Sequence, residues 1–134
     1  MDFKTIQDSV INIISYIKDI ENNLYKKYNL TNNEALVFLK IANNEITQTE
    51  ICEMLNFAKS TVHSIILKFL KKDLIYILDK NKKEKYLYLS DRGKDLFINL
   101  NNDLYNRRKE LYLKLSDDEL KSVLNISLKL FNHK

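Results

Sequence analysis

Three short signatures fix where three helices begin. Thr31-Asn32-Asn33-Glu34, Thr47-Gln48-Thr49-Glu50 and Ser116-Asp117-Asp118-Glu119 each place a hydroxyl residue three positions before a glutamate. In such a capping box the hydroxyl accepts a hydrogen bond from the backbone N–H of the glutamate, and the carboxylate accepts one from the N–H of the cap residue. Apolar residues follow each signature, so we expect helices to start directly after Thr31, Thr47 and Ser116.

The segment ahead of the first signature, residues 3–28, carries the strongest periodic pattern in the chain. Its apolar residues, at alternating steps of three and four, are Phe3, Ile6, Val10, Ile13, Ile17, Ile20 and Leu24. This spacing predicts one long helix with an apolar stripe. The stripe extends beyond what one small domain can cover, so we expect part of it to meet a second copy of the chain. Packing wholly against its own domain is the alternative.

Residues 47–72 predict two helices joined by a short turn. The first is short, and Ile51 and Leu55 form its inner face. The second starts at "KSTVHSIILKFLKK", with Val62, Ile65, Ile66 and Phe69 inward and Lys59, Ser60, His63, Ser64 and Lys68 largely outward. Two helices of this size with so short a connection form a helix-turn-helix.

Two short runs rich in branched and aromatic residues follow, Leu74–Leu78 and Lys85–Leu89. We expect them to pair as a hairpin with a polar loop of about six residues at its tip. Asp73 precedes the hairpin in a turn where the left-handed conformation is needed, and Ser90 follows it as the cap of another long helix. The hairpin therefore lies between the helix-turn-helix and that helix.

Positive charge gathers in the same region. Residues 57–94 hold ten Lys or Arg and four Asp or Glu, a balance of +6, whereas the rest of the chain holds 12 basic and 14 acidic residues, a balance of −2. An anionic polymer is the natural partner of such a segment. Charge alone leaves a solvated surface equally open.

The sequence gives little support for catalysis, metal binding or insertion into a membrane. The chain has two widely separated histidines, one cysteine and no glycine-rich phosphate loop, so we expect no catalytic residues, no metal site and no cofactor. Cys52 is interpreted as a packing residue, with redox sensing as the alternative. Without a secretory signal or an apolar run of about 20 residues, the chain is predicted to be cytoplasmic and not to span a membrane.

Three stretches carry a resemblance to a known family, "LTNNEALVFLKI" (30–41), "ITQTEICEMLNFAKSTVHSIILKFLKKDLI" (46–75) and "YLYLSDRGKDL" (86–96). Their order and spacing resemble the MarR (multiple antibiotic resistance regulator) family of winged-helix transcription regulators. With the flanking helices, the resemblance covers nearly the whole chain. It implies a mainly α fold with a small β-hairpin wing.

The resemblance also implies separate DNA-binding and dimerisation regions along the chain. Residues 1–134 would form a single MarR-like domain, in which 31–94 are the winged helix-turn-helix DNA-binding region. Residues 1–30 and 95–134 would form the helical dimerisation region, with N- and C-terminal dimerisation helices. The partners implied are a second copy of the chain and double-stranded DNA carrying a pseudo-palindromic operator.

Site residues follow from the resemblance by position. The recognition helix would contact DNA through Lys59, Ser60, Thr61, His63, Ser64 and Lys68. The wing would contact DNA through Lys80, Asn81, Lys82, Lys83 and Lys85. The dimer interface would include Phe3, Ile6, Val10, Ile13, Ile17, Leu120, Leu124, Leu128 and Phe131. For His63, contact with a base or phosphate and simple exposure to solvent are equally open.

The chain departs from the family pattern in the wing. Relatives carry an Asp-x-Arg before the second strand, where this chain has Asn81 and Lys83, so we expect a wing that is less rigidly braced. The family's glycine in the turn before the wing is Asp73 here. The family's threonine after the second strand is Ser90, which keeps the cap.

These features predict a homodimeric, sequence-specific DNA-binding regulator, a repressor responding to a small-molecule effector, and not an enzyme. Tyr16, Tyr25 and Tyr28 are either interface core or the lining of a crevice for a small aromatic or anionic effector. The alternative function is a winged-helix adaptor or assembly subunit that binds a protein partner. The operator, the regulated genes and the effector cannot be read from the sequence, and neither can the choice between repression and activation.

Overall fold

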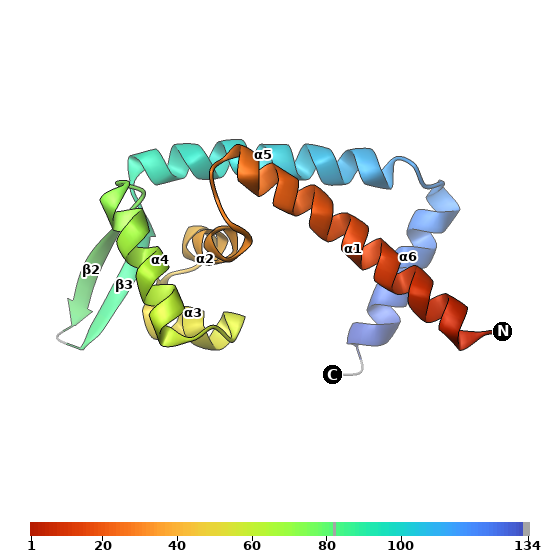
Figure 1. The fold of residues 1–134 in the computed structure, drawn as a ribbon, viewed down its shortest axis with the longest axis horizontal. Helices are drawn as coiled ribbons and strands as arrows, with labels where there is room; N and C mark the ends of the chain where they lie inside the picture. The colour runs from red at the N-terminus through yellow and green to blue at the C-terminus, as the bar shows by residue number, and fades with distance from the viewer. Residues whose placement is uncertain (82, 133–134) are drawn as a thin grey trace. The chain divides into compact units, whose positions relative to one another are not determined.

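A computed structural model describes residues 1–81 and 83–132 of the chain (Figure 1). The chain divides into two compact units, Met1–Asn101 and Asn102–Lys134. Lys82 was predicted as a wing contact and lies outside the described residues. No helix in the described part of the chain is long and apolar enough to cross a membrane.

The described residues form six helices and three short strands. In chain order these are α1 (Phe3–Lys27), α2 (Asn32–Asn43), β1 (Ile46–Thr47), α3 (Gln48–Leu55), α4 (Lys59–Lys71), β2 (Ile75–Asn81), β3 (Glu84–Leu89), α5 (Asp91–Tyr112) and α6 (Asp117–Phe131). The strands make one antiparallel sheet in the order β1-β3-β2. The predicted fold class, mainly α with a small wing, is confirmed.

All three predicted capping boxes are present. Thr31 Oγ1 accepts from the backbone N–H of Glu34 at 3.2 Å, and the Glu34 carboxylate accepts from the N–H of Thr31 at 2.9 Å. The same reciprocal pairs start α3 at Thr47 and α6 at Ser116. In each box the two hydrogen bonds join residues only three apart in sequence, so a local signal marks each helix start.

The core of the first unit sets which way α4 faces. The predicted inward residues of α4, Val62, Ile65, Ile66 and Phe69, are all buried. The Phe69 ring meets the ring of Phe38 from α2 edge-on, with centroids 5.8 Å apart. Because these apolar residues face α2 and α3, the opposite side of α4 is left to solvent.

The sheet differs from the predicted hairpin in two ways. A third strand is present, since Ile46 and Thr47 pair with Leu87 and Tyr86 of β3. A strand of two residues between two helices shows no alternation, so no sequence pattern indicated it. The turn is also shorter than the six residues expected, because β2 continues to Asn81 and β3 starts at Glu84. The sequence did not indicate these strand ends because most of their residues are charged. They are exposed and bury no apolar face.

The tip of the wing has its own brace. The side-chain oxygen of Asn81 accepts from the backbone N–H groups of Lys83 and Glu84, at 3.1 and 3.0 Å. An Asn side chain that bonds the backbone in this way closes a tight turn. The expectation of a less rigidly braced wing concerns the Asp–Arg pair of relatives, and it stays a prediction, because these hydrogen bonds are made by Asn81 to the backbone alone.

The base of the wing closes on the turn that precedes it. Asp73 adopts the left-handed conformation, φ 58°, as predicted. Ser90 Oγ donates to the Asp73 carbonyl at 2.6 Å and accepts from the Gly93 N–H at 3.1 Å, which confirms its role as a cap. Gly93 packs so closely here that a Cβ would lie 2.0 Å from the Leu74 carbonyl oxygen. Only glycine fits at this position.

Gly93→Ala is expected to destabilise the protein by about 1–3 kcal/mol, because the added methyl forces the backbone of the turn to move. Urea unfolding at pH 7 measures the change in the free energy of unfolding. Asn99→Ala, at an exposed position of the same helix, is the matched control and should change stability little. Equal unfolding midpoints for the two variants would contradict the close packing of Gly93.

Candidate nucleic-acid interface

The exposed side of α4 presents polar and basic residues at its start. Lys59, Ser60, His63 and Ser64 are exposed and Thr61 is half-buried. Ala58, the N-cap residue, makes no side-chain cap hydrogen bond, so the N–H groups of the first turn remain able to donate. A helix start of this kind, with a lysine beside it, can bind a phosphate oxygen.

A surface hollow of about 890 Å³ joins this helix start to the wing. Its lining comes from the end of β1, from α3 and α4, and from the wing tip: Thr47, Gln48, Thr49, Glu50, Cys52, Glu53, Lys59, His63, Lys83, Glu84 and Lys85. Four of the predicted DNA contacts, two from α4 and two from the wing tip, therefore lie around one concave surface. Ser60, Thr61 and Ser64 are on α4 but not in this lining, and Asn81 is at the tip of the wing.

Carboxylates in the hollow were missed by the sequence analysis. Glu50, Glu53 and Glu84 balance the charge of Lys59, Lys83 and Lys85. Glu50 is held by its capping box with Thr47, which had been interpreted only as a helix start. The hollow therefore includes carboxylate acceptors, whereas the contacts predicted from the sequence were lysine, hydroxyl, Asn and His side chains only.

Glu84 is also held in place. It accepts from the Tyr86 hydroxyl at 2.8 Å, and this hydrogen bond raises the pKa of Tyr86 above its ordinary value of 10.0. Tyr86 therefore remains a neutral donor at physiological pH.

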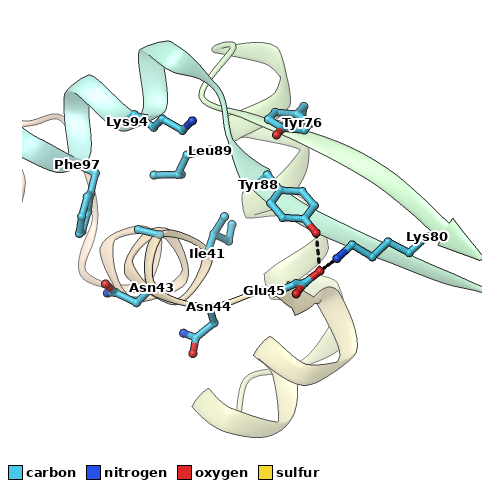
Figure 2. A pocket seen from close by; sticks show the side chains of 11 residues that line it. Ile41, Asn43, Asn44, Glu45, Tyr76, Lys80, Tyr88, Leu89, Lys94 and Phe97 are labelled. Atoms are coloured by element: carbon cyan, nitrogen blue, oxygen red, sulfur yellow. Dashed lines mark hydrogen bonds and ion pairs between the residues drawn. The ribbon is translucent and has the colours of Figure 1, made fainter.

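Lys80 lies apart from the other wing lysines. Its ammonium pairs with the Glu45 carboxylate (Figure 2). It also lies over the rings of Tyr86 and Tyr88, at 5.3 and 5.8 Å from their centroids. It lines a different hollow, of about 520 Å³, with residues of α2, the sheet and the start of α5. The structure thus does not bring Lys80 together with Lys83 and Lys85.

Lys68 is likewise engaged elsewhere. Its ammonium lies 2.6 Å from the carboxylate of Glu34, a side chain that is only 7% exposed. Burial alone would raise the pKa of Glu34, but the hydrogen bonds and charge of Lys68, together with the hydrogen bonds from Thr31, lower it below 4.5. Lys68 therefore links α4 to the start of α2.

The structure also locates the single cysteine and allows a search for metal-binding groups. Cys52 is a free, half-buried thiol on α3 that lines the first hollow. Across residues 1–81 and 83–132, no group of three or more His, Cys, Asp or Glu side chains is arranged to hold a metal ion.

The helix pair α3–α4 followed by the wing β2–β3 defines a winged helix-turn-helix. No protein-family model and no curated protein matches the chain. Solved structures do match. A protein of unknown function from Listeria innocua has 19% sequence identity and a TM-score of 0.81, with 98% of this chain and 94% of that one covered.

Two named regulators from Staphylococcus aureus share the fold. MepR, a transcription regulator of the multidrug efflux pump MepA, has 20% identity and a TM-score of 0.76 over 95% of this chain and 98% of its own. MarR, solved with salicylate and kanamycin, has 20% identity and a TM-score of 0.80 over 95% and 88%. A MepR mutant bound to an oligodeoxyribonucleotide, at 19% identity, covers 96% and 98% with a TM-score of 0.66. The chain therefore has the fold of MarR-type winged-helix regulators, as the sequence resemblance implied.

Glu34→Gln should lower the free energy of unfolding by about 1.5 kcal/mol at pH 7, because glutamine keeps the capping box but loses the charge that pairs with Lys68. The pKa of Glu34 is lowered in the folded state, so its stabilisation is present above 4.5 and is lost as the pH falls through the folded-state value. Urea unfolding from pH 7 to pH 3 measures this.

The stability difference between Glu34→Gln and the unaltered chain should therefore shrink in acid. Glu119→Gln is the matched control, because Glu119 occupies the same place in an exposed capping box. A Glu34→Gln variant that loses no more stability than Glu119→Gln at pH 7 would show that the pair with Lys68 contributes nothing.

Proposed function

We propose that the protein is a homodimeric, sequence-specific DNA-binding transcription regulator, a repressor that responds to a small-molecule effector. The observation that carries this proposal is the hollow in which the start of α4 meets the wing tip. The helix places Lys59 and His63 there, and the wing places Lys83 and Lys85 there. Residues 31–94 would be the DNA-binding region.

The hydrogen-bond donors and acceptors of the hollow together suit the edges of base pairs. Lysines neutralise phosphates and give affinity without sequence information. Reading a base requires donors and acceptors at fixed places, and a carboxylate can accept from the amino group of cytosine. Gln48, Thr49 and Glu53 provide such groups beside His63. This favours a regulator that selects its site over an adaptor with a basic surface.

Exposed apolar side chains support the homodimer. In α1, Phe3 is 81% exposed and Ile13 59%, whereas Leu24 and Tyr25 near the end of the helix are buried in the first unit. Among the described residues of α6 none is buried. Monomers rarely leave such surfaces to water, so residues 1–30 and 95–134 would dimerise.

The partner residues would come from both ends of the chain. The predicted interface residues are exposed or half-buried: Phe3, Ile6, Val10, Ile13, Ile17, Leu120, Leu124, Leu128 and Phe131. A small aromatic or anionic effector is part of the proposal because MarR of S. aureus was solved with salicylate. Tyr16 is half exposed and Tyr28 half-buried, so either can contact such a molecule, whereas Tyr25 is 2% exposed.

Selection of bound DNA from a random pool tests the proposal, followed by mobility shifts on the selected sequence and on the DNA upstream of the gene. A two-fold dimer should select a pseudo-palindrome with half-sites about 34 Å apart. Retardation should persist in excess competitor DNA. A pool that yields no shared sequence, with retardation abolished by a little competitor, would favour the adaptor function.

Lys83→Ala with Lys85→Ala should weaken binding to all sequences and lower the slope of log K against log salt by about 0.9 for each phosphate that is no longer neutralised. Fluorescence anisotropy at several salt concentrations measures the slope. Lys114→Ala, an exposed lysine between α5 and α6, removes the same kind of charge outside the proposed interface and should leave the slope unchanged. An unchanged slope in the double variant would mean that the wing tip does not touch DNA.

Ile13→Glu should shift the dimer to monomers, because a carboxylate on the apolar stripe of α1 would be buried without a partner. Sedimentation velocity at micromolar concentration measures the two species. Lys18→Glu, an exposed position on the same helix, changes charge without entering the stripe and should remain dimeric. If the unaltered chain itself sediments as a monomer, the homodimer is excluded.

A further inference from the structure

The sheet carries a polar cluster on the face turned away from the core. Register places Tyr76 opposite Tyr88 and Leu78 opposite Tyr86, while Leu87 and Leu89 on the alternate positions are buried. The rings of Tyr76 and Tyr88 stack with centroids 5.5 Å apart. Stacked tyrosine rings therefore cover this outer face along β2 and β3.

Three side chains from separate segments meet on this outer face of the sheet. Glu45 precedes β1, Tyr88 lies on β3 and Lys80 on β2. The Glu45 carboxylate accepts from the Tyr88 hydroxyl at 2.8 Å and pairs with the Lys80 ammonium (Figure 2). The cluster thus links the outer strand of the wing to the corner that leads into the helix-turn-helix.

A β-bulge presents Lys80 to this cluster. Asp79 pairs with Lys85 and Asn81 with Glu84, so Lys80 is the extra residue on β2. Bulges bend a strand and change the direction of a side chain. Here the ammonium of Lys80 lies over the rings of Tyr86 and Tyr88, which attract a cation through their faces.

We propose that Glu45, Lys80 and Tyr88 form a latch that fixes the angle of the wing, and that Lys80 is a positioning residue for DNA binding and not a DNA contact. The proposal rests on the proposed function and assigns to Glu45 a role that its negative charge alone would argue against. The latch holds the outer face of the wing, so that Lys83 and Lys85 are presented beside Lys59 and His63.

Simple electrostatics and the latch predict opposite results for one substitution. Glu45→Gln removes a negative charge, which by charge alone strengthens binding to a polyanion. In the latch, the same change releases Lys80 and the wing, and binding should weaken. The latch combines an exposed ion pair, a hydrogen bond and two cation–π contacts, so the expected loss of affinity is about three- to tenfold.

The DNA test uses the full chain and the sequence selected from the random pool. Glu45→Gln and Lys80→Met should each weaken binding about three- to tenfold, and the double variant should be little worse than either. Asp79→Asn is the control, since it removes one negative charge from the same strand outside the latch, and should bind as tightly or more tightly. Lys80→Met should leave the salt slope unchanged. A slope lowered by about 0.9 would make Lys80 a phosphate contact and overturn the proposal.

A second measurement needs no DNA. Amide hydrogen exchange of residues 76–81 and 84–88 should be faster in Glu45→Gln and Lys80→Met than in Asp79→Asn, because opening of the hairpin no longer breaks the latch. Equal exchange in all three variants would overturn the latch whatever the DNA results. Faster exchange in a chain that binds no DNA would retain the latch and reject the proposed function.

Discussion

The packing of α4 against α2 and α3 is the constraint on which the surface of this protein depends. Phe69 meets Phe38 edge-on, and Val62 is buried with no exposed area. Side chains on a helix repeat every 3.6 residues, so burying this face leaves only one orientation for the polar face. Lys59 and His63 therefore point to solvent, because Val62 and Phe69 on the opposite face of α4 are buried in the core.

Three sets of side-chain contacts hold the wing, at its base, at its tip and on its outer face. Ser90 and Gly93 close its base on the Asp73 turn, and Asn81 closes its tip. Between them, the Glu45 carboxylate joins the outer face to the corner before β1. Each set involves only a few side chains, and together they restrict the movement of a two-stranded ribbon that would be only marginally stable alone.

The sequence predicted the helices and their caps well because both depend on near neighbours. Capping boxes span four residues, and the inner face of α4 repeats at helical spacing. The pairing of Ile46 with Leu87, the bulge at Lys80 and the contact of Lys68 with Glu34 depend on partners that are not near neighbours in the chain. No local pattern marks such contacts, so the sequence indicated candidate lysine and hydroxyl residues but neither their arrangement nor the carboxylates beside them.

The count of basic residues therefore overstates the charge available to a partner. Residues 57–94 carry a balance of +6, yet Lys68 is paired with Glu34 and Lys80 with Glu45. Around the main hollow, Glu50, Glu53 and Glu84 offset the lysines that remain. Because long-range attraction depends on net charge while selectivity depends on where donors and acceptors lie, the proposed regulator would select a DNA site with less attraction to DNA in general.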